Sequence, residues 1–134
     1  MNELTRGAHH VGLTVRDVEA AAQFFVDALG FEILMRRPAY PAVFVGDGTL
    51  MLTLWQAEEP EAAVPFDRKR GIGLHHLALR VPDAATLEAL HQTLAARDDV
   101  EIEFAPEPLG ATGARHMMLA GPSGIRLELV WAPA

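Results

Sequence analysis

The sequence predicts an α+β fold made of two similar modules, each with the element order βαβββ. The main observation is an internal repeat: the segment HHVGLTVRD at 9–17 returns as HHLALRVPD at 75–83, about half the chain further on. In both copies a strand of alternating polar and apolar residues leads to an aspartate and then to an amphipathic helix. Three short β-like runs follow each helix, so both halves of the chain have the same order of elements.

Module one covers residues 8–56, and its first strand is expected over 8–15. Its helix begins after Asp17, a preferred N-cap residue, and ends at Gly30, which favours the left-handed backbone of a helix C-cap. Apolar residues of this helix recur at helical spacing at Val18, Ala21, Ala22, Phe25 and Leu29. Three strands are then expected over 31–36, 42–45 and 49–55.

Module two covers residues 74–131 and opens with a strand expected over 74–81. Its helix follows Asp83 and places Leu87, Leu90 and Leu94 on one face. The remaining strands are expected over 100–104, 114–120 and 124–131. The segment 57–73 is charged and contains two prolines, so it is predicted to be a surface linker between the modules of a single domain, 1–134.

The amino-acid composition excludes several classes of partner and of metal site. The chain has 134 residues, of which 50% are hydrophobic, which is enough for one core without cross-links. Eighteen acidic against eleven basic residues give a net charge of −7, and this disfavours nucleic acid as a partner. Without cysteine, a metal site would have to use histidine and carboxylate ligands. No segment approaches the ~18 apolar residues of a membrane span, so we expect no membrane partner and a cytoplasmic location.

Strand alternation indicates which side chains face away from the helices. In the strand at 8–15, Val11, Leu13 and Val15 form the apolar face, which leaves His10 on the opposite face. The same alternation puts further polar residues on helix-free faces: His76, Arg80, His116, Arg126 and Glu128. One histidine in a strand is usually an ordinary polar residue, but its repetition at the same phase in both modules favours a pair of ligands. Two sheets that curl toward one another would turn these faces into a polar-floored cleft.

Other residues are assigned simpler roles. Asp17 and Asp83 are interpreted as helix caps, and His9 and His75 as solvated residues at strand ends. Met51, Met118 and Trp55 lie on helix-free faces and are expected to line the wall of a substrate cavity.

Together these motifs resemble the vicinal oxygen chelate superfamily. Each module opens with H-x-x-L-x-V-x-D, and the chain ends near GPSGIRLELV. The superfamily includes glyoxalase I, extradiol dioxygenases, fosfomycin-resistance proteins, methylmalonyl-CoA epimerase and bleomycin-binding proteins, and the resemblance covers Ala8 to Trp131. It implies a cup-shaped mixed sheet with helices on the outer face and metal ligands on the first and last strands of each module. The matching positions in this chain are His10, Met51, His76 and Glu128.

Met51 departs from the family pattern, because a thioether is a poor ligand for a hard divalent ion. The resemblance therefore implies a set of two histidines and one carboxylate, His10, His76 and Glu128, for one divalent ion of Fe, Mn, Zn, Ni or Co. This departure argues against the activities of glyoxalase I and the epimerase, because both enzymes place an oxygen ligand at the position that Met51 occupies here. Dioxygenases and fosfomycin enzymes share the smaller set, but both use a tyrosine where this chain has Met118. The fosfomycin enzymes also have a lysine and a serine-rich cation loop where this chain has EPLGATGA.

The expected protein is a metal-dependent enzyme that acts on a small oxygenated organic molecule. His116 is the candidate for proton transfer and Glu128 for both metal binding and catalysis. Arg80 and Arg126 would bind a substrate carboxylate or pair with acids of the protein. Ring-cleaving dioxygenation is placed slightly ahead of redox-neutral lyase or isomerase chemistry, and a metal-free bleomycin-resistance type of binding protein is the alternative. The resemblance also implies a homodimer.

Overall fold

A computed structural model describes residues 3–134, which divide into two compact units: the first ends at Ala63 and the second covers Val64–Ala134. The first contains, in order, β1 (His10–Val15), α1 (Val18–Leu29), β2 (Glu32–Arg37), β3 (Ala42–Gly46) and β4 (Met51–Gln56). The second contains β5 (Leu77–Arg80), α2 (Ala84–Ala95), β6 (Glu101–Pro108), β7 (Arg115–Ala120) and β8 (Arg126–Trp131). Short 3-10 turns lie at η1 (Pro60–Ala62) and η2 (Pro122–Gly124). The predicted βαβββ order of both halves is confirmed.

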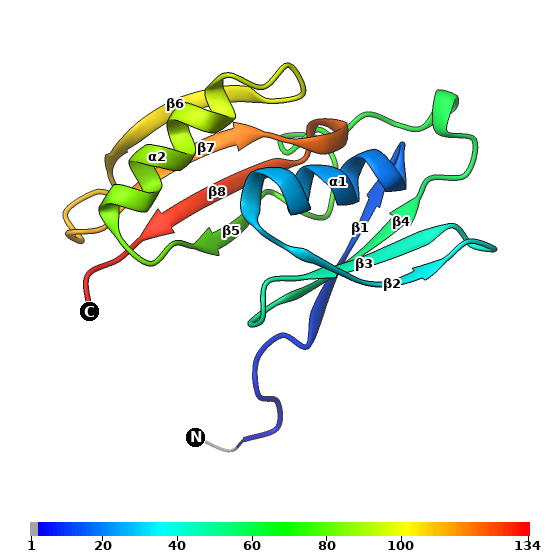
Figure 1. Ribbon diagram of the computed structural model, residues 1–134, viewed down its shortest axis with the longest axis horizontal. Helices are drawn as coiled ribbons and strands as arrows, with labels where there is room; N and C mark the ends of the chain where they lie inside the picture. The colour runs from blue at the N-terminus through cyan, green and yellow to red at the C-terminus, as the bar shows by residue number, and fades with distance from the viewer. Residues whose placement is uncertain (1–2) are drawn as a thin grey trace. The chain divides into compact units, whose positions relative to one another are not determined.

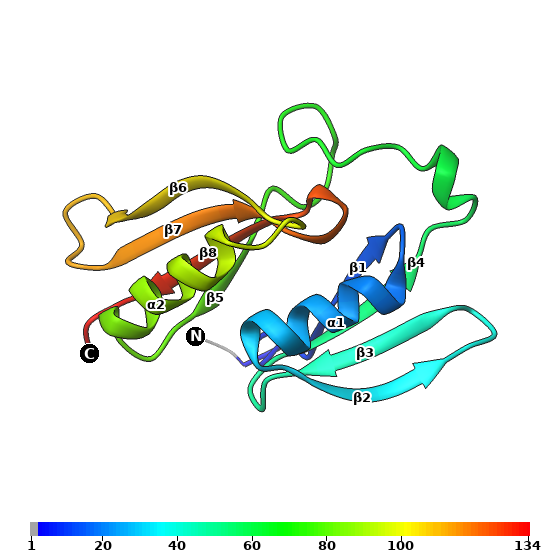
Figure 2. The ribbon, with the colours of Figure 1, turned by 45° about the horizontal axis from the view of Figure 1, so that its top comes forward.

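Each unit forms one four-stranded mixed sheet, and the two sheets have the same topology. The strand orders are β1-β4-β3-β2 and β5-β8-β7-β6. In each sheet the first strand runs parallel to the last, and all other neighbours are antiparallel. The first strand of a unit therefore lies at a sheet edge beside the last strand, although the rest of the unit separates them in sequence (Figure 2).

Both helices begin at the aspartates that the sequence predicts. Asp17 Oδ1 accepts a hydrogen bond from the Ala20 amide at 3.0 Å, and Asp83 Oδ1 accepts one from the Thr86 amide at 2.6 Å. These bonds satisfy amides that have no partner within the first turn of a helix. α1 ends at Gly30, whose φ of 73° lies in the left-handed region that glycine adopts without strain.

In each unit the helix covers one face of the sheet and the hydrophobic core lies between them (Figure 1). The fully buried residues of the first core are mainly Val15, Ala21, Ala22, Phe24, Phe25, Val43, Val45, Leu52 and Leu54. Those of the second are mainly Leu87, Leu94, Met117, Leu119, Leu127 and Leu129. The apolar faces predicted for the strands thus pack under the helices, and this leaves the opposite faces for polar side chains.

Strand lengths differ from the prediction in two places that matter for the site. The strand expected over 74–81 begins only at Leu77, because its parallel pairing with β8 starts at the pair of Leu77 and Leu127. His76 therefore precedes β5 rather than lying within it. The strand expected over 100–104 continues to Pro108, because β6 pairs along β7 as far as Arg115.

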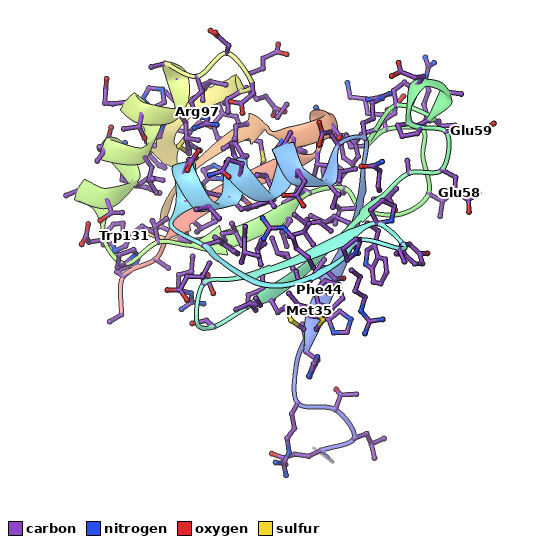
Figure 3. All side chains as sticks on the ribbon, turned by 45° about the vertical axis from the view of Figure 1, so that its right-hand side comes forward. Met35, Phe44, Glu58, Glu59, Arg97 and Trp131 are labelled. Carbon is purple, nitrogen blue, oxygen red and sulfur yellow. The ribbon has the colours of Figure 1, made fainter. Side chains whose placement is uncertain are left out.

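The segment between β4 and β5 is exposed along most of its length, as expected for the charged run 57–73. Figure 3 shows Glu58 and Glu59 extending outward from it, and both are solvent-exposed. Figure 3 also labels Met35 and Phe44, which are opposite each other on β2 and β3. Within residues 3–134, every helix is too short or too polar to cross a lipid bilayer.

Candidate active site

Glu128 on β8 is a buried carboxylate held between two histidines. Its side chain is only 10% exposed. Oε1 lies 3.2 Å from Nε2 of His76, and Oε2 lies 2.5 Å from Nδ1 of His116. Burial of a carboxylate is costly unless hydrogen bonds or opposite charges compensate it. Here each oxygen faces an imidazole nitrogen, which can donate a proton to it or share a metal ion with it. The structure thus brings together three of the residues selected from the sequence.

The register of the second sheet explains this contact. Glu128 is opposite Ala78 on β5 and opposite Met118 on β7. His76 is two residues before Ala78, and His116 is two residues before Met118, so side chains at these positions point to the same face of the sheet as Glu128. That face is the one opposite α2.

A second hydrogen-bonded chain begins at His76. Its Nδ1 lies 2.8 Å from Nδ1 of His75, which in turn lies 3.4 Å from a guanidinium nitrogen of Arg126. Arg126 binds Glu103 on β6 through two hydrogen bonds, of 2.9 and 2.6 Å. Arg68 contacts the same carboxylate at 3.2 Å. Two roles were expected for Arg126, binding of a substrate carboxylate or pairing with an acid of the protein. In the structure it pairs with an acid of the protein, Glu103.

The electrostatics of this chain favour an ionised pair beside a neutral ring. The hydrogen bonds from Arg126 lower the pKa of Glu103, and those to Glu103 raise the pKa of Arg126. Desolvation, followed by the charge of Arg126, lowers the pKa of His75. The interpretation of His75 as a merely solvated residue is therefore incomplete: it is exposed, yet it connects Arg126 to His76.

His116 is enclosed by residues that the sequence reading did not single out. Only 12% of its side chain is exposed. Its ring lies 4.9 Å from that of Phe104, and its Nε2 lies 3.9 Å from a carboxylate oxygen of Glu107. Phe104 is the last residue of the strand predicted over 100–104, whereas Glu107 lies beyond that predicted end, so the prediction did not place Glu107 in the sheet.

The first unit repeats part of this arrangement. Nδ1 of His9 lies 2.9 Å from Nδ1 of His10, as in the pair of His75 and His76. Thr53 on β4 is 2% exposed, and its Oγ1 accepts a hydrogen bond of 2.9 Å from the Trp55 indole. Gly12 packs against both, since a Cβ there would lie 3.2 Å from Thr53 Oγ1.

The registers correct the position assigned to Met51. In the first sheet, Met51 is opposite His10 and Thr53 is opposite Gly12. Gly12 corresponds to Ala78 in the repeat, and Ala78 is opposite Glu128. The counterpart of Glu128 is therefore Thr53, and the counterpart of Met51 is Arg126. The matching strings Leu-Thr-Leu at 52–54 and Leu-Glu-Leu at 127–129 are the sequence signal that could have shown this.

The remaining candidates differ in their surroundings. Trp55 contacts Tyr40 and Phe44, with ring centroids 4.4 and 5.6 Å apart, so it belongs to an aromatic cluster on the helix-free face of the first unit. Met118 is buried at 5% exposure. Arg80 is exposed and has no ion pair among the described residues.

As potential metal donors, His76 and Glu128 lie together in the second unit, whereas His10 belongs to the first. Within residues 3–134, no three histidine or carboxylate side chains already stand in an arrangement that could hold a metal ion. The chemistry of the pair nevertheless fits a divalent ion with nitrogen and oxygen ligands, because one imidazole nitrogen lies 3.2 Å from one oxygen of a largely buried carboxylate.

The fold and the site define a class of proteins with repeated βαβββ units and histidine and carboxylate groups on the helix-free faces. The model of the Glyoxalase/Bleomycin resistance protein/Dioxygenase superfamily matches residues 7–129. The chain belongs to this superfamily, which confirms the resemblance found in its sequence.

Three individual similarities add detail. A 2-epi-5-epi-valiolone epimerase of Actinomyces sp. is 28% identical over 94% of this chain and 79% of its own length. A catechol-2,3-dioxygenase of Bacillus subtilis (strain 168) is 32% identical over 58% of this chain, but the match spans only 27% of the dioxygenase. The crystal structure of a glyoxylase/bleomycin resistance protein/dioxygenase domain from Frankia sp. EAN1pec has a TM-score of 0.81 at 22% identity, covering 96% of this chain and 99% of that one.

Proposed function

We propose that the protein is a divalent-metal-dependent enzyme that acts on a small oxygenated organic molecule by redox-neutral proton transfer, as an epimerase or isomerase does. The observation that carries this proposal is the buried Glu128 with one histidine on each carboxylate oxygen. Such a group provides a carboxylate for a metal ion and an oriented imidazole for a proton in one place.

The metal would be held by His76 and Glu128, which lie 3.2 Å apart in the second unit. When bound, the ion would stabilise negative charge on a substrate oxygen next to the reacting carbon. Arg80 is exposed and unpaired among the described residues, so it remains the candidate for a substrate carboxylate.

His116 is the proposed base. An ionised carboxylate only accepts hydrogen bonds, so the proton in the contact with Glu128 belongs to Nδ1 of His116. The neutral ring then carries its lone pair on Nε2, which can take a proton from carbon. Glu107, 3.9 Å from Nε2, would stabilise the imidazolium that forms. Protonation of the carbon on its opposite face by a water molecule, with His116 giving up its proton to solvent, would complete an epimerisation, and no electrons leave the substrate.

Two findings favour this reaction over the dioxygenation ranked first in the sequence analysis. The objection to epimerase chemistry rested on Met51, and Thr53 stands at the corresponding position instead. Its hydroxyl oxygen is a harder donor than a thioether. In addition, the relative matched over 94% of this chain is an epimerase.

Ring-cleaving dioxygenation is the second candidate, because the catechol-2,3-dioxygenase similarity is specific though partial. A binding protein for a cationic antibiotic remains the alternative outside enzymes, and the charge of −7 would suit it. Such a protein would need neither a metal ion nor an oriented base.

The test follows hydrogen exchange at carbon. Protein loaded separately with Zn, Mn, Co and Fe(II) is incubated in D₂O with 2-epi-5-epi-valiolone and a panel of α-hydroxy ketones, and proton NMR follows the hydrogen beside the carbonyl. We expect metal-dependent deuterium incorporation without oxygen uptake. Oxygen uptake with catechols and Fe(II), without exchange, would replace the proposal by its second candidate. Binding without either reaction and without metal uptake would favour the antibiotic-binding protein.

A further inference from the structure

We propose that Glu103, Arg126 and His75 act as positioning residues that fix the proton of His76 on Nδ1 and so present its Nε2 lone pair toward Glu128. These four residues form one continuous hydrogen-bonded chain in the second unit. The assignment of the His76 tautomer depends only on these hydrogen bonds within the second unit. Its consequence, that His76 is prepared as a metal ligand, rests on the proposed function.

Donor and acceptor rules determine where the proton lies. A guanidinium group has donors only, so in its contact with Arg126 the Nδ1 of His75 must be the acceptor. The same Nδ1 lies 2.8 Å from Nδ1 of His76. A contact between two nitrogens at this distance requires one hydrogen between them, and His75 has none to offer at that atom. Its single lone pair is then shared between the nearer donor, His76 at 2.8 Å, and the more distant Arg126 at 3.4 Å. The proton therefore belongs to Nδ1 of His76, and the neutral ring of His76 leaves Nε2 bare.

Arg126, which donates to His75 in this series of hydrogen bonds, is held in a fixed orientation. Arg126 is only 12% exposed, and its two parallel bonds to Glu103 form the bidentate arrangement that fixes the plane of a guanidinium. Arg68 also contacts Oε1 of this carboxylate, at 3.2 Å, and adds a second cation beside it. The direction of the hydrogen bond toward His75 is thus set by an ion pair whose arginine is largely buried.

The consequence appears at Glu128. With its proton on Nδ1, His76 directs a lone pair at Oε1 of Glu128, 3.2 Å away. Two acceptors at this distance repel each other unless a second proton on Nε2 or a metal ion lies between them. A divalent ion satisfies both groups at once, and a hydrogen-bonded partner on the far side of a ligating histidine is the usual device for holding its tautomer.

The first unit provides an internal contrast. His9 and His10 make the same contact, at 2.9 Å between their Nδ1 atoms. The position that corresponds to Arg126 is Met51, which has no hydrogen to donate. The proton between His9 and His10 can therefore lie on either ring, and we expect a defined tautomer for His76 but a mixture for His10.

The experiment reads the tautomer directly. Metal-free protein labelled with ¹⁵N at histidine is studied at about pH 8, where ordinary imidazoles are neutral, by long-range ¹H–¹⁵N correlation, with His76→Gln used for assignment. We expect the Nδ1–H pattern for His76, the opposite of the form that free histidine favours in water. Arg126→Met introduces the residue that the first unit has at the corresponding position, Met51. It should convert the single tautomer of His76 to a mixture of both tautomers. Arg126→Lys retains a donor and should restore part of the bias.

Arg115→Met is the matched control, because Arg115 is also ion-paired in the same sheet, with Glu88, but lies outside the chain. It should leave the His76 pattern unchanged. If Arg126→Met does not fold, His75→Phe carries the test, since it removes the accepting nitrogen from an exposed side chain. An unchanged Nδ1–H pattern in the folded variant would overturn the inference.

Zinc titration separates the two proposals. Arg126→Met should weaken zinc affinity about 10- to 100-fold, as the loss of such partners does elsewhere. If the tautomer responds as expected but the unmutated protein takes up no metal, the positioning role stands and the proposed function fails. If metal binds and the tautomer is insensitive to Arg126, the positioning role fails alone.

Discussion

Thr53 occupies in β4 the position that Glu128 occupies in β8. Each lies between two buried leucines, and each is opposite the residue two places after the second histidine of its repeat, Gly12 or Ala78. They are also the two buried polar residues of the described chain. One unit therefore carries a neutral hydroxyl where the other carries a carboxylate, so at this position only the second unit offers a charged ligand to a metal ion.

This equivalence predicts the effect of Thr53→Glu. The substitution should place a carboxylate beside His10 as Glu128 lies beside His76, and should raise zinc affinity at least several-fold. Met51→Glu is the control and should not, because its counterpart is Arg126. Calorimetric titration measures both. Equal gains from the two variants would contradict the register equivalence. Thr53→Glu should also lower stability without metal, because a buried unpaired carboxylate is costly.

Glu128→Gln should abolish tight metal binding. The amide keeps the size of the side chain but removes the negative charge that a divalent ion requires. Metal content after dialysis and titration in the micromolar range measure the loss. Glu101→Gln, at an exposed position on β6, is the control and should bind metal like the unmutated protein.

His116→Gln should separate proton transfer from metal binding. We expect the rate of hydrogen exchange at carbon to fall by ~10²- to 10⁴-fold, the usual effect of losing a positioned base. Metal affinity should change far less, because His116 contacts Glu128 and is outside the proposed ligand set. If metal affinity falls as steeply as for Glu128→Gln, His116 is a ligand rather than the base.

Acid stability should depend on Glu103. Arg126 lowers the pKa of this carboxyl in the folded protein, so the ion pair adds stability that is fully present above the unfolded pKa and is lost as pH falls through the folded one. Arg126, whose pKa is raised, stays charged throughout. Urea unfolding from about pH 6 down to about pH 3 should show a shallower decline for Glu103→Gln. An identical slope would refute this assignment.

Assembly is a separate prediction. Two βαβββ units can pair within one chain or across a dimer, and the resemblance to the superfamily implies a homodimer. Sedimentation velocity at high micromolar concentration should therefore give a dimer. A single monomeric boundary under those conditions would contradict it.

The elements themselves could be predicted because their causes are local. The N-caps Asp17 and Asp83, the stop at Gly30 and the alternation of the strands all act between residues close in sequence. The repeat then showed that both halves share one topology. Strand ends were less predictable, because pairing with a distant partner decides where a strand begins, as the late start of β5 at Leu77 shows.

By itself, the sequence determined the two-unit fold, the superfamily, and the faces that carry His76, His116 and Glu128, since alternation along a strand assigns a face without knowledge of its neighbours. Tertiary structure alone decided which side chains meet on those faces. Strand register brought Glu103 to Arg126 and Glu107 to His116. Register depends on pairing between segments far apart in the chain, and a single sequence carries no direct record of it.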